Sequence, residues 1–486
     1  MRHVAVLLPL VLSLAVTAVA LAQPSTSDAL LFAAPTGAEL RARLLAHADS
    51  VAATDAPEAA RALAYRGLSF AREGEPDSAV ALYQRTFGLD HRPERRIDLA
   101  EALLMRLAKG DAERARAVLR PIQPVTPELP DVGAATVQGL FAWSHYLAGS
   151  ADSAARLLAP IETWLSTRQE WRYRMACVAF ERADWTRVII LLTPLAVASR
   201  NLDVDVMDLL KKSAEKLNAG RRLEPRLLYE IAQRDKVEAE LLAALSARRV
   251  SFTGGDGFPL GGVLLAPSAP ARPRAAVVLV AAGDTLAVYD TLAVGLRRMG
   301  LAVMLLEPRG SGRSVAAGCP LPDSWRGREA QMQTRSAGDV RAAVRALARE
   351  AKADTARYLV VGVGASAPIA VEAARLDRRA GVLMLVSPTP SPVDRGPMRA
   401  TLAALRRPVY FQTGPEDFTT WEVIDSLYRV CDQRASRVAD TDKPGTHATL
   451  FRRDPKILER LRRWLAEAWP RPTAPRATPP SRPRKG

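Results

Sequence analysis

The residues with the clearest capacity for chemistry lie in the stretch Arg357–Ala374, RYLVVGVGASAPIAVEAA. An apolar, β-branched run at Tyr358–Val361 predicts a buried strand, and an alanine-rich run with helical spacing follows it. The small residues between the two runs, GVGASAP, predict a tight turn. A strand, a tight turn and a helix in this order can hold a serine hydroxyl above a parallel sheet, where it acts as a nucleophile.

The serine motif G-x-S-x-G fits this turn in two registers. In the first, Ser366 is the nucleophile, Gly364 precedes it, Pro368 replaces the second glycine, and the N–H of Ala367 would stabilise an oxyanion. In the second, Gly362 and Ser366 are the flanking small residues, and the nucleophile position falls on Gly364, which has no side chain. A third interpretation makes Ser366 a helix cap. The sequence leaves these alternatives open.

From Arg248 onward, apolar strand-like runs alternate with helical patterns. This alternation is typical of a mostly parallel sheet with helices on both faces. Gly254–Gly257 separates two short β-rich runs and predicts a hairpin. Further buried strands are expected at Ala275–Val280, Leu301–Leu306, Tyr358–Val361, Gly381–Val386 and Pro408–Phe411.

A turn motif after one of these strands gives the first resemblance to a known family. Glu307–Ser314, EPRGSGRS, matches the D-x-R-G-x-G-x-S turn of the α/β-hydrolases, with glutamate in place of aspartate. From about Arg248 to Trp469 the chain resembles this family. Ala282-Gly283 stands where the family often has His-Gly in its oxyanion loop. The resemblance therefore implies that Gly283 or a neighbour donates an N–H to the oxyanion.

The same resemblance implies the two partners of the nucleophile. Asp417, in the loop Gly414–Asp417, stands where the family places its acid, and His447 stands in the matching histidine loop, PGTHATL. His447 would take the serine proton and return it to the leaving group, while Asp417 would orient the imidazole. The chain order Ser, Asp, His is the one that this fold uses. The alternatives are a turn-capping role for Asp417 and a surface loop position for His447.

The preceding part of the chain, residues 28–247, predicts helices throughout. A short pattern of a small residue, an acidic or hydroxyl residue and then a buried-type side chain recurs every 34–39 residues, beginning at Gly74, Gly110, Gly149 and Ala183. The pattern resembles the tetratricopeptide repeat, in three or four degenerate units; an irregular helical bundle is the alternative. Such arrays commonly bind peptides on a concave face. Four tryptophans of the later units either pack in the core or line a groove: Trp143, Trp164, Trp171 and Trp185.

Neither end of the chain is expected to belong to the folded core. Residues 1–22 combine a short basic start, an apolar run and an Ala-Leu-Ala site, which is typical of a secretory signal peptide; a membrane anchor is the alternative. We expect an exported protein, periplasmic or secreted, without a transmembrane anchor after cleavage. Residues 470–486 are rich in proline and arginine and are expected to be disordered. Cys319 and Cys431 could form a disulfide, or all three cysteines could be free thiols.

The whole chain bounds the remaining choices. With 486 residues the chain should form more than one domain. Its formal charge of +16 is spread along the chain, and no basic patch is interleaved with aromatic residues. Nucleic acid is therefore not an expected partner. The expectation is a helical repeat domain at 28–247 and an α/β-hydrolase domain at 248–469. Its expected function is a serine hydrolase for a small ester, thioester or amide, with a protein or peptide partner on the repeats. The alternative is an inactive binding or scaffold protein with Gly364 at the nucleophile position. No metal or organic cofactor is implied.

Overall fold

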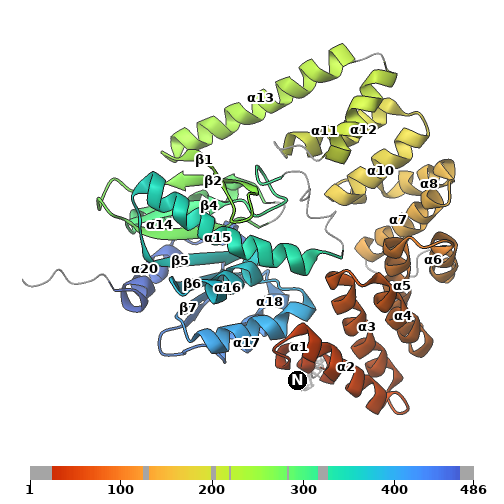
Figure 1. Ribbon diagram of the computed structural model, residues 1–486, viewed down its shortest axis with the longest axis horizontal. Coiled ribbons are helices and arrows are strands. Elements are labelled where there is room, and N and C mark those ends of the chain that lie inside the picture. The colour runs from red at the N-terminus through yellow and green to blue at the C-terminus, as the bar shows by residue number, and fades with distance from the viewer. Residues whose placement is uncertain are drawn as a thin grey trace, which may run out of the picture.

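The computed structural model describes residues 25–123, 131–198, 204–217, 220–281, 284–315 and 327–470. Up to Ala244 its regular elements are helices, and strands alternate with helices from Arg248 onward (Figure 1). The expected signal peptide, Gly283, Cys319 and the tail after Pro470 lie outside the described residues. Within the described part, no helix is long and apolar enough to cross a membrane. Cys177 and Cys431 are free thiols.

The helical part contains the following elements. They are α1 (Thr26–Ala33), α2 (Gly37–Val51), α3 (Ala56–Glu73), α4 (Pro76–Leu89), α5 (Pro93–Arg106), α6 (Asp111–Leu119), α7 (Asp131–Leu147), α8 (Ala151–Leu158), α9 (Glu162–Leu165), α10 (Gln169–Glu181), α11 (Trp185–Ala198), α12 (Val204–Lys216) and α13 (Gly220–Ala244), with 3₁₀ turns η1 (Arg120–Ile122) and η2 (Ala159–Ile161). The long helix α13 leads directly into the first strand (Figure 1).

The recurring small residues all stand at helix junctions with left-handed backbone. Their φ angles are +85° at Gly74, +85° at Gly110, +82° at Gly149 and +57° at Ala183. At the first junction, the N–H groups of Gly74 and Glu75 donate to carbonyl oxygens of the preceding helix, and the same pair of bonds recurs at the junctions after α7 and α10. The repeated sequence pattern therefore corresponds to a repeated helix-ending geometry.

The side chains that follow each junction form one continuous core. Residues five positions after the junction are fully buried, and those four positions later are at most 7% exposed; they are Ala79, Ala115, Ala154 and Val188, then Tyr83, Leu119, Leu158 and Leu192. In the first unit, a Cβ on Gly67 would lie 3.1 Å from the Tyr83 ring, which explains the glycine there. These helix pairs contact one another in chain order. Their assignment to the tetratricopeptide family stays a prediction.

The second half contains one eight-stranded sheet with the order β1-β2-β4-β3-β5-β6-β7-β8. The strands are β1 (Arg248–Thr253), β2 (Pro259–Leu265), β3 (Arg274–Leu279), β4 (Leu301–Leu306), β5 (Asp354–Val363), β6 (Ala380–Val386), β7 (Val409–Gln412) and β8 (Arg437–Ala439). Strand β2 is antiparallel to both of its neighbours, and all other neighbouring pairs are parallel. The helices are α14 (Asp290–Arg298), α15 (Glu329–Ala351), α16 (Ala367–Leu376), α17 (Arg395–Leu405), α18 (Phe418–Tyr428), α19 (Leu450–Arg453) and α20 (Lys456–Ala468).

Helices cover both faces of this sheet. On β3, Ala275, Val277 and Leu279 belong to an apolar cluster with residues of α15 and α16. The alternating residues Ala276 and Val278 belong to a second cluster, with residues of α14 and α20. Alternation is required because successive side chains of a strand point to opposite faces. A mostly parallel sheet buried on both faces fits an α/β-hydrolase domain, as the sequence predicted.

The turn that carried the family resemblance holds the sheet to its hairpin and to α15. Arg309 is 3% exposed and pairs with two carboxylates: Asp339 of α15 at 2.6 and 2.7 Å, and Asp256 of the β1–β2 turn at 2.7 Å. The hydrogen bonds from Arg309 lower the pKa of Asp256 to about 2, whereas burial raises the pKa of Asp339. Two bidentate pairs fix the plane of the Arg309 guanidinium. They therefore also fix the position of the turn Glu307–Ser314 that carries it.

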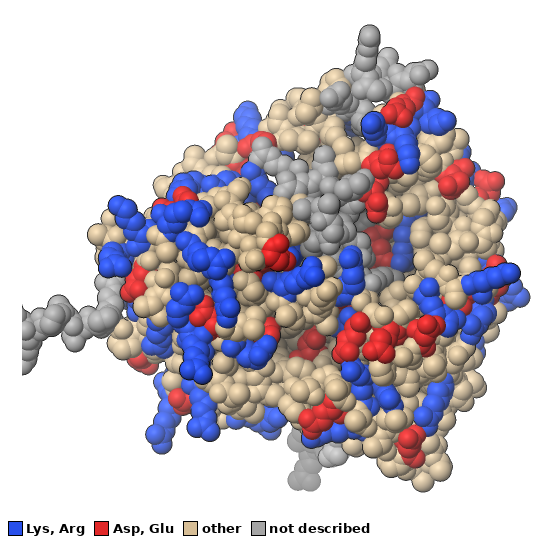
Figure 2. Space-filling model, viewed as in Figure 1, with Lys and Arg blue, Asp and Glu red and all other residues tan. Residues whose placement is uncertain are grey.

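The helical part rests on the sheet domain through α1. Helix α1 contacts α17, and a Cβ on Gly396 would lie 2.2 Å from the carbonyl oxygen of Ala34, so only glycine allows this approach. Arg72 of α3 pairs with Asp394 at 2.9 Å. In Figure 1 the red helix α1 accordingly lies beside α17, and α2 lies next to α1. The face in Figure 2 shows Lys and Arg interspersed with Asp and Glu, as expected for charge on solvated surfaces.

The buried half of the Arg309 network should contribute far more stability than its exposed half. Asp339→Asn removes one partner of a pair that is 1% and 3% exposed, so we expect a loss of about 3 kcal/mol in the free energy of unfolding. Asp256 is 44% exposed, and Asp256→Asn should cost under about 1 kcal/mol. Urea denaturation of the two variants tests this; equal losses would contradict it.

Asp256 should also give stability a defined pH dependence. Its pKa is about 2 in the folded protein and 3.8 ordinarily, so the unfolded state binds the proton more readily. The stability that wild type has over Asp256→Asn should therefore be constant above pH 3.8 and should be lost as the pH falls toward 2. Urea titrations at several pH values measure this difference; a difference that grows on acidification would refute the assignment.

Candidate active site

The expected strand–turn–helix is present at the middle of the sheet. Strand β5 ends at Val363, the 3₁₀ turn η5 occupies Gly364–Ser366, and α16 begins at Ala367. A Cβ on Gly362 would lie 2.7 Å from atoms of Ala367 and Ala370, so the glycine allows α16 to pass close to the strand. Gly364 is buried and has a φ of +55°, a conformation that side-chain-bearing residues rarely adopt.

The imidazole of His447 faces Gly364. An ideal Cβ on Gly364 would lie 2.8 Å from His447 Nε2 and 3.0 Å from Cε1. The ring thus stands directly against the position where a side chain at residue 364 would begin. Together with the close helix approach at Gly362 and the left-handed backbone, this contact favours the second register, with Gly364 between Gly362 and Ser366.

Ser366 points away from His447. Its side chain belongs to a residue that is 4% exposed, and its Oγ accepts a hydrogen bond from the N–H of Val363 at 2.9 Å. The same Oγ lies 2.8 Å from the carbonyl oxygen of Val363 and 3.2 Å from that of Leu279 in β3. Among the described residues no hydrogen bond joins it to His447. The hydroxyl closes the turn onto β5 and β3; it does not cap α16.

The two oxyanion donors predicted from the sequence have different outcomes. The N–H of Ala367 donates to the carbonyl oxygen of Gly364 and is therefore used inside the turn. Gly283 lies outside the described residues. With residue 364 at the nucleophile position, the donor expected from this fold is the next residue, Ala365, which is exposed.

Asp417 and His447 are brought together through a third residue, Ser387. The Asp417 carboxylate accepts hydrogen bonds from Ser387 Oγ at 2.5 Å and from the Gly414 N–H at 3.2 Å. Ser387 Oγ also accepts a hydrogen bond from the backbone N–H of His447 at 3.1 Å. Within the described residues, no hydrogen bond joins the Asp417 carboxylate to the His447 ring. Asp417 therefore positions the histidine loop through its backbone.

Sequence reasoning missed Ser387. It directly follows β6, is fully buried and has a φ of +43°, which is strained for a residue with a side chain. Its N–H donates to the carbonyl oxygen of Gln412, so it is held at both ends. The available signal was its place at the carboxyl end of a parallel strand, where sites of this class of sheet form.

The assembled site offers His447 as a base, and among the described residues no serine, threonine or cysteine side chain is hydrogen-bonded to its ring. His447 is partly exposed, with a φ of +52°, and its Nε2 is directed at the turn. Neutral imidazole can accept a proton from water or a polar ligand. Within the described residues, no group of three or more His, Cys, Asp and Glu side chains could hold a metal ion.

Comparison with known proteins finds similarity for under half of the chain. No family model matches, and no curated protein is significantly similar. The esterase domain of a Rhodothermus marinus protein is 15% identical, with a TM-score of 0.34, over 46% of this chain and 98% of that one. An esterase from Pyrococcus furiosus is 16% identical, with a TM-score of 0.36, over 47% and 94%. A predicted CIB-like hydrolase from Thermoplasma acidophilum is 13% identical, with a TM-score of 0.35, over 45% and 99%.

These identities and TM-scores below 0.5 do not establish a shared activity. The assignment of an α/β-hydrolase-like fold rests on the sheet itself, on its strand order and on the helices that cover both faces.

The contact between Gly364 and His447 can be tested without any activity. Gly364→Ala should destabilise the protein by roughly 1–3 kcal/mol, because the new Cβ meets both a left-handed backbone and the imidazole. In a His447→Ala background the same change should cost less, because only the backbone strain remains. A double-mutant cycle by urea denaturation measures the coupling; additive effects would show that the ring does not face residue 364.

Proposed function

We propose that the sheet domain is a binding domain that does not form an acyl-enzyme intermediate. The observation that carries this proposal is the glycine at position 364, with His447 Nε2 standing 2.8 Å from its ideal Cβ. Covalent catalysis needs a nucleophile beside its base, and this position supplies none. The base and the network around Ser387 and Asp417 would then serve to shape a site for a polar small molecule.

Catalysis through Ser366 would require several contacts to break first. Its hydroxyl would have to leave the N–H and carbonyl of Val363 and the carbonyl of Leu279, and would have to turn out of a buried position. Breaking buried hydrogen bonds without replacement costs about 1–3 kcal/mol per unsatisfied group. The described geometry therefore supports a structural role for Ser366.

A second candidate function is hydrolysis of a small ester, thioester or amide by water. The supporting observation is the orientation of His447, whose Nε2 is directed at the turn at the carboxyl end of β5. In this case His447 would remove a proton from water as the water attacks the substrate carbonyl. It would return that proton to the leaving alcohol, thiol or amine as the bond to the carbonyl carbon breaks, so no intermediate covalently bound to the protein would form. Asp417 would act as a positioning residue through Ser387.

We further propose that the helical part is a degenerate tetratricopeptide-like array that binds a protein or peptide, and that the protein is exported. The first proposal is supported by the left-handed junctions at Gly74, Gly110, Gly149 and Ala183 and by the core that follows them. The second rests on residues 1–22 of the sequence. Amino-terminal sequencing of the protein recovered from an export-competent host tests it; an intact amino terminus would contradict cleavage.

A fluorophosphonate probe distinguishes the proposed binding domain and the proposed hydrolysis by water from the serine hydrolase that the sequence predicted. Wild type and Ser366→Ala should both remain unlabelled, because among the described residues no serine hydroxyl is hydrogen-bonded to the His447 ring. Gly364→Ser should gain labelling, because the new hydroxyl would stand beside His447. The combination of Gly364→Ser with His447→Ala should lose it again. Labels are read by mass spectrometry of the intact protein, with an active esterase as the positive control.

The outcomes separate cleanly. An adduct on wild type that disappears in Ser366→Ala would overturn the proposal and restore Ser366 as the nucleophile. Hydrolysis of p-nitrophenyl acetate by wild type, without an adduct and lost in His447→Ala, would favour the water mechanism. Absence of both adduct and turnover would favour the binding domain.

A further inference from the structure

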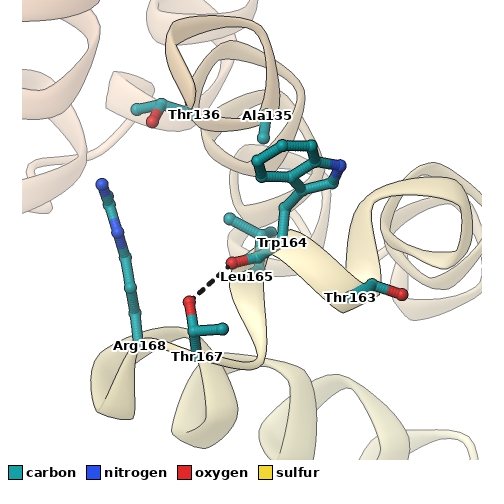
Figure 3. A pocket seen from close by; sticks show the side chains of 7 residues that line it. All are labelled: Ala135, Thr136, Thr163, Trp164, Leu165, Thr167 and Arg168. Carbon is teal, nitrogen blue, oxygen red and sulfur yellow. Dashed lines mark hydrogen bonds between the residues drawn. The ribbon is translucent and has the colours of Figure 1, made fainter. Parts of the chain in front are cut away.

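The helical part contains a pocket whose residues are distant in sequence from the candidate active site. It has a volume of about 460 Å³ and is formed by α7, by α9 and by the residues that join α9 to α10. Its lining residues are Ala135, Thr136, Thr163, Trp164, Leu165, Thr167 and Arg168 (Figure 3). A volume of this size falls in the range of small-molecule sites, which is roughly 300–1,000 Å³.

Trp164 stands out among the tryptophans that the sequence singled out. Trp171 is 3% exposed and belongs to the helical core, whereas Trp164 is 53% exposed. In Figure 3 the Trp164 ring lies along one wall of the pocket, next to Ala135. An indole face that is not used in the core offers a broad apolar surface at small cost in side-chain entropy. This wall suits an apolar ring or branched chain.

Arg168 stands on the opposite side of the pocket. Figure 3 shows its side chain extended across from Trp164. Its guanidinium has no ionic partner among the described residues, and the pocket lining contains no acidic side chain. The hydroxyl of Thr167 donates to the carbonyl oxygen of Trp164 at 2.9 Å, which holds the segment between the two walls in shape. A cation opposite an aromatic face, with no internal counter-charge, is complementary to an anion that has an apolar body.

We propose that this pocket binds a small carboxylate with an apolar body, the ring or branched chain lying on Trp164 and the carboxylate pairing with Arg168. The guanidinium has the planar fork that matches a carboxylate in two parallel hydrogen bonds. A free small molecule fits better than a long peptide, because the lining residues come from only two short segments, 135–136 and 163–168. This inference is independent of whether the sheet domain binds or hydrolyses.

The test is isothermal titration of the full chain with 3-phenylpropionate and with its neutral amide, 3-phenylpropionamide. We expect the carboxylate to bind at least about tenfold more tightly than the amide, because a charge-assisted pair is lost in the amide. Arg168→Gln should abolish this preference, and Trp164→Ala should weaken both ligands. The matched control is Arg120→Gln, which removes an exposed arginine outside the pocket lining and should leave binding unchanged.

Circular dichroism of each variant shows whether it is folded, so a loss of binding can be assigned to the pocket. Equal affinity of wild type for the carboxylate and the amide, or binding of neither, would overturn the proposal. A third ligand, the peptide Gly-Gly-Phe with a free carboxylate, distinguishes a free small molecule from the carboxyl terminus of a peptide. If this peptide binds more tightly than 3-phenylpropionate, the proposed ligand is wrong and a peptide terminus is the better assignment.

Discussion

The contact between Gly364 and the His447 ring is the constraint on which the rest of the site depends. The turn needs left-handed backbone at this residue, and the imidazole stands where a side chain would begin. Glycine satisfies both conditions without strain, since it has no Cβ and tolerates positive φ. The same absence of a side chain leaves position 364 without a hydroxyl group.

The elements around this contact converge from several strands of one sheet. Ser366 ties the turn back to β5 and β3 through backbone partners. Ser387, after β6, connects the Asp417 carboxylate to the backbone of His447. All these groups lie at the carboxyl ends of parallel strands, where loops from distant parts of the chain meet. One sheet, covered by helices on both faces, thus brings these groups together at one edge.

The two halves of the chain are joined by packing as well as by sequence. Helix α1 lies against α17, with glycine required at residue 396, and Arg72 pairs with Asp394 across the same boundary. The helical part also contacts the turn η6 (Pro392–Asp394), which follows β6, and Gln333 near the start of α15, so it meets the sheet domain at segments that follow the carboxyl ends of strands. Its pocket at Trp164 and the site at Gly364 can act on different ligands.

The sequence by itself indicated the helices of the first half and every strand of the sheet except the short β8, because apolar periodicity and glycine positions report local structure directly. It also placed Asp417 and His447 in two separate loops, and it left two registers open at the turn. Only the tertiary structure shows the Ser366 hydroxyl hydrogen-bonded to backbone groups of β5 and β3, because these two strands lie far apart in the chain. Which residue faces His447 likewise depends on a contact between loops that are distant in the chain, and no local pattern encodes such a contact.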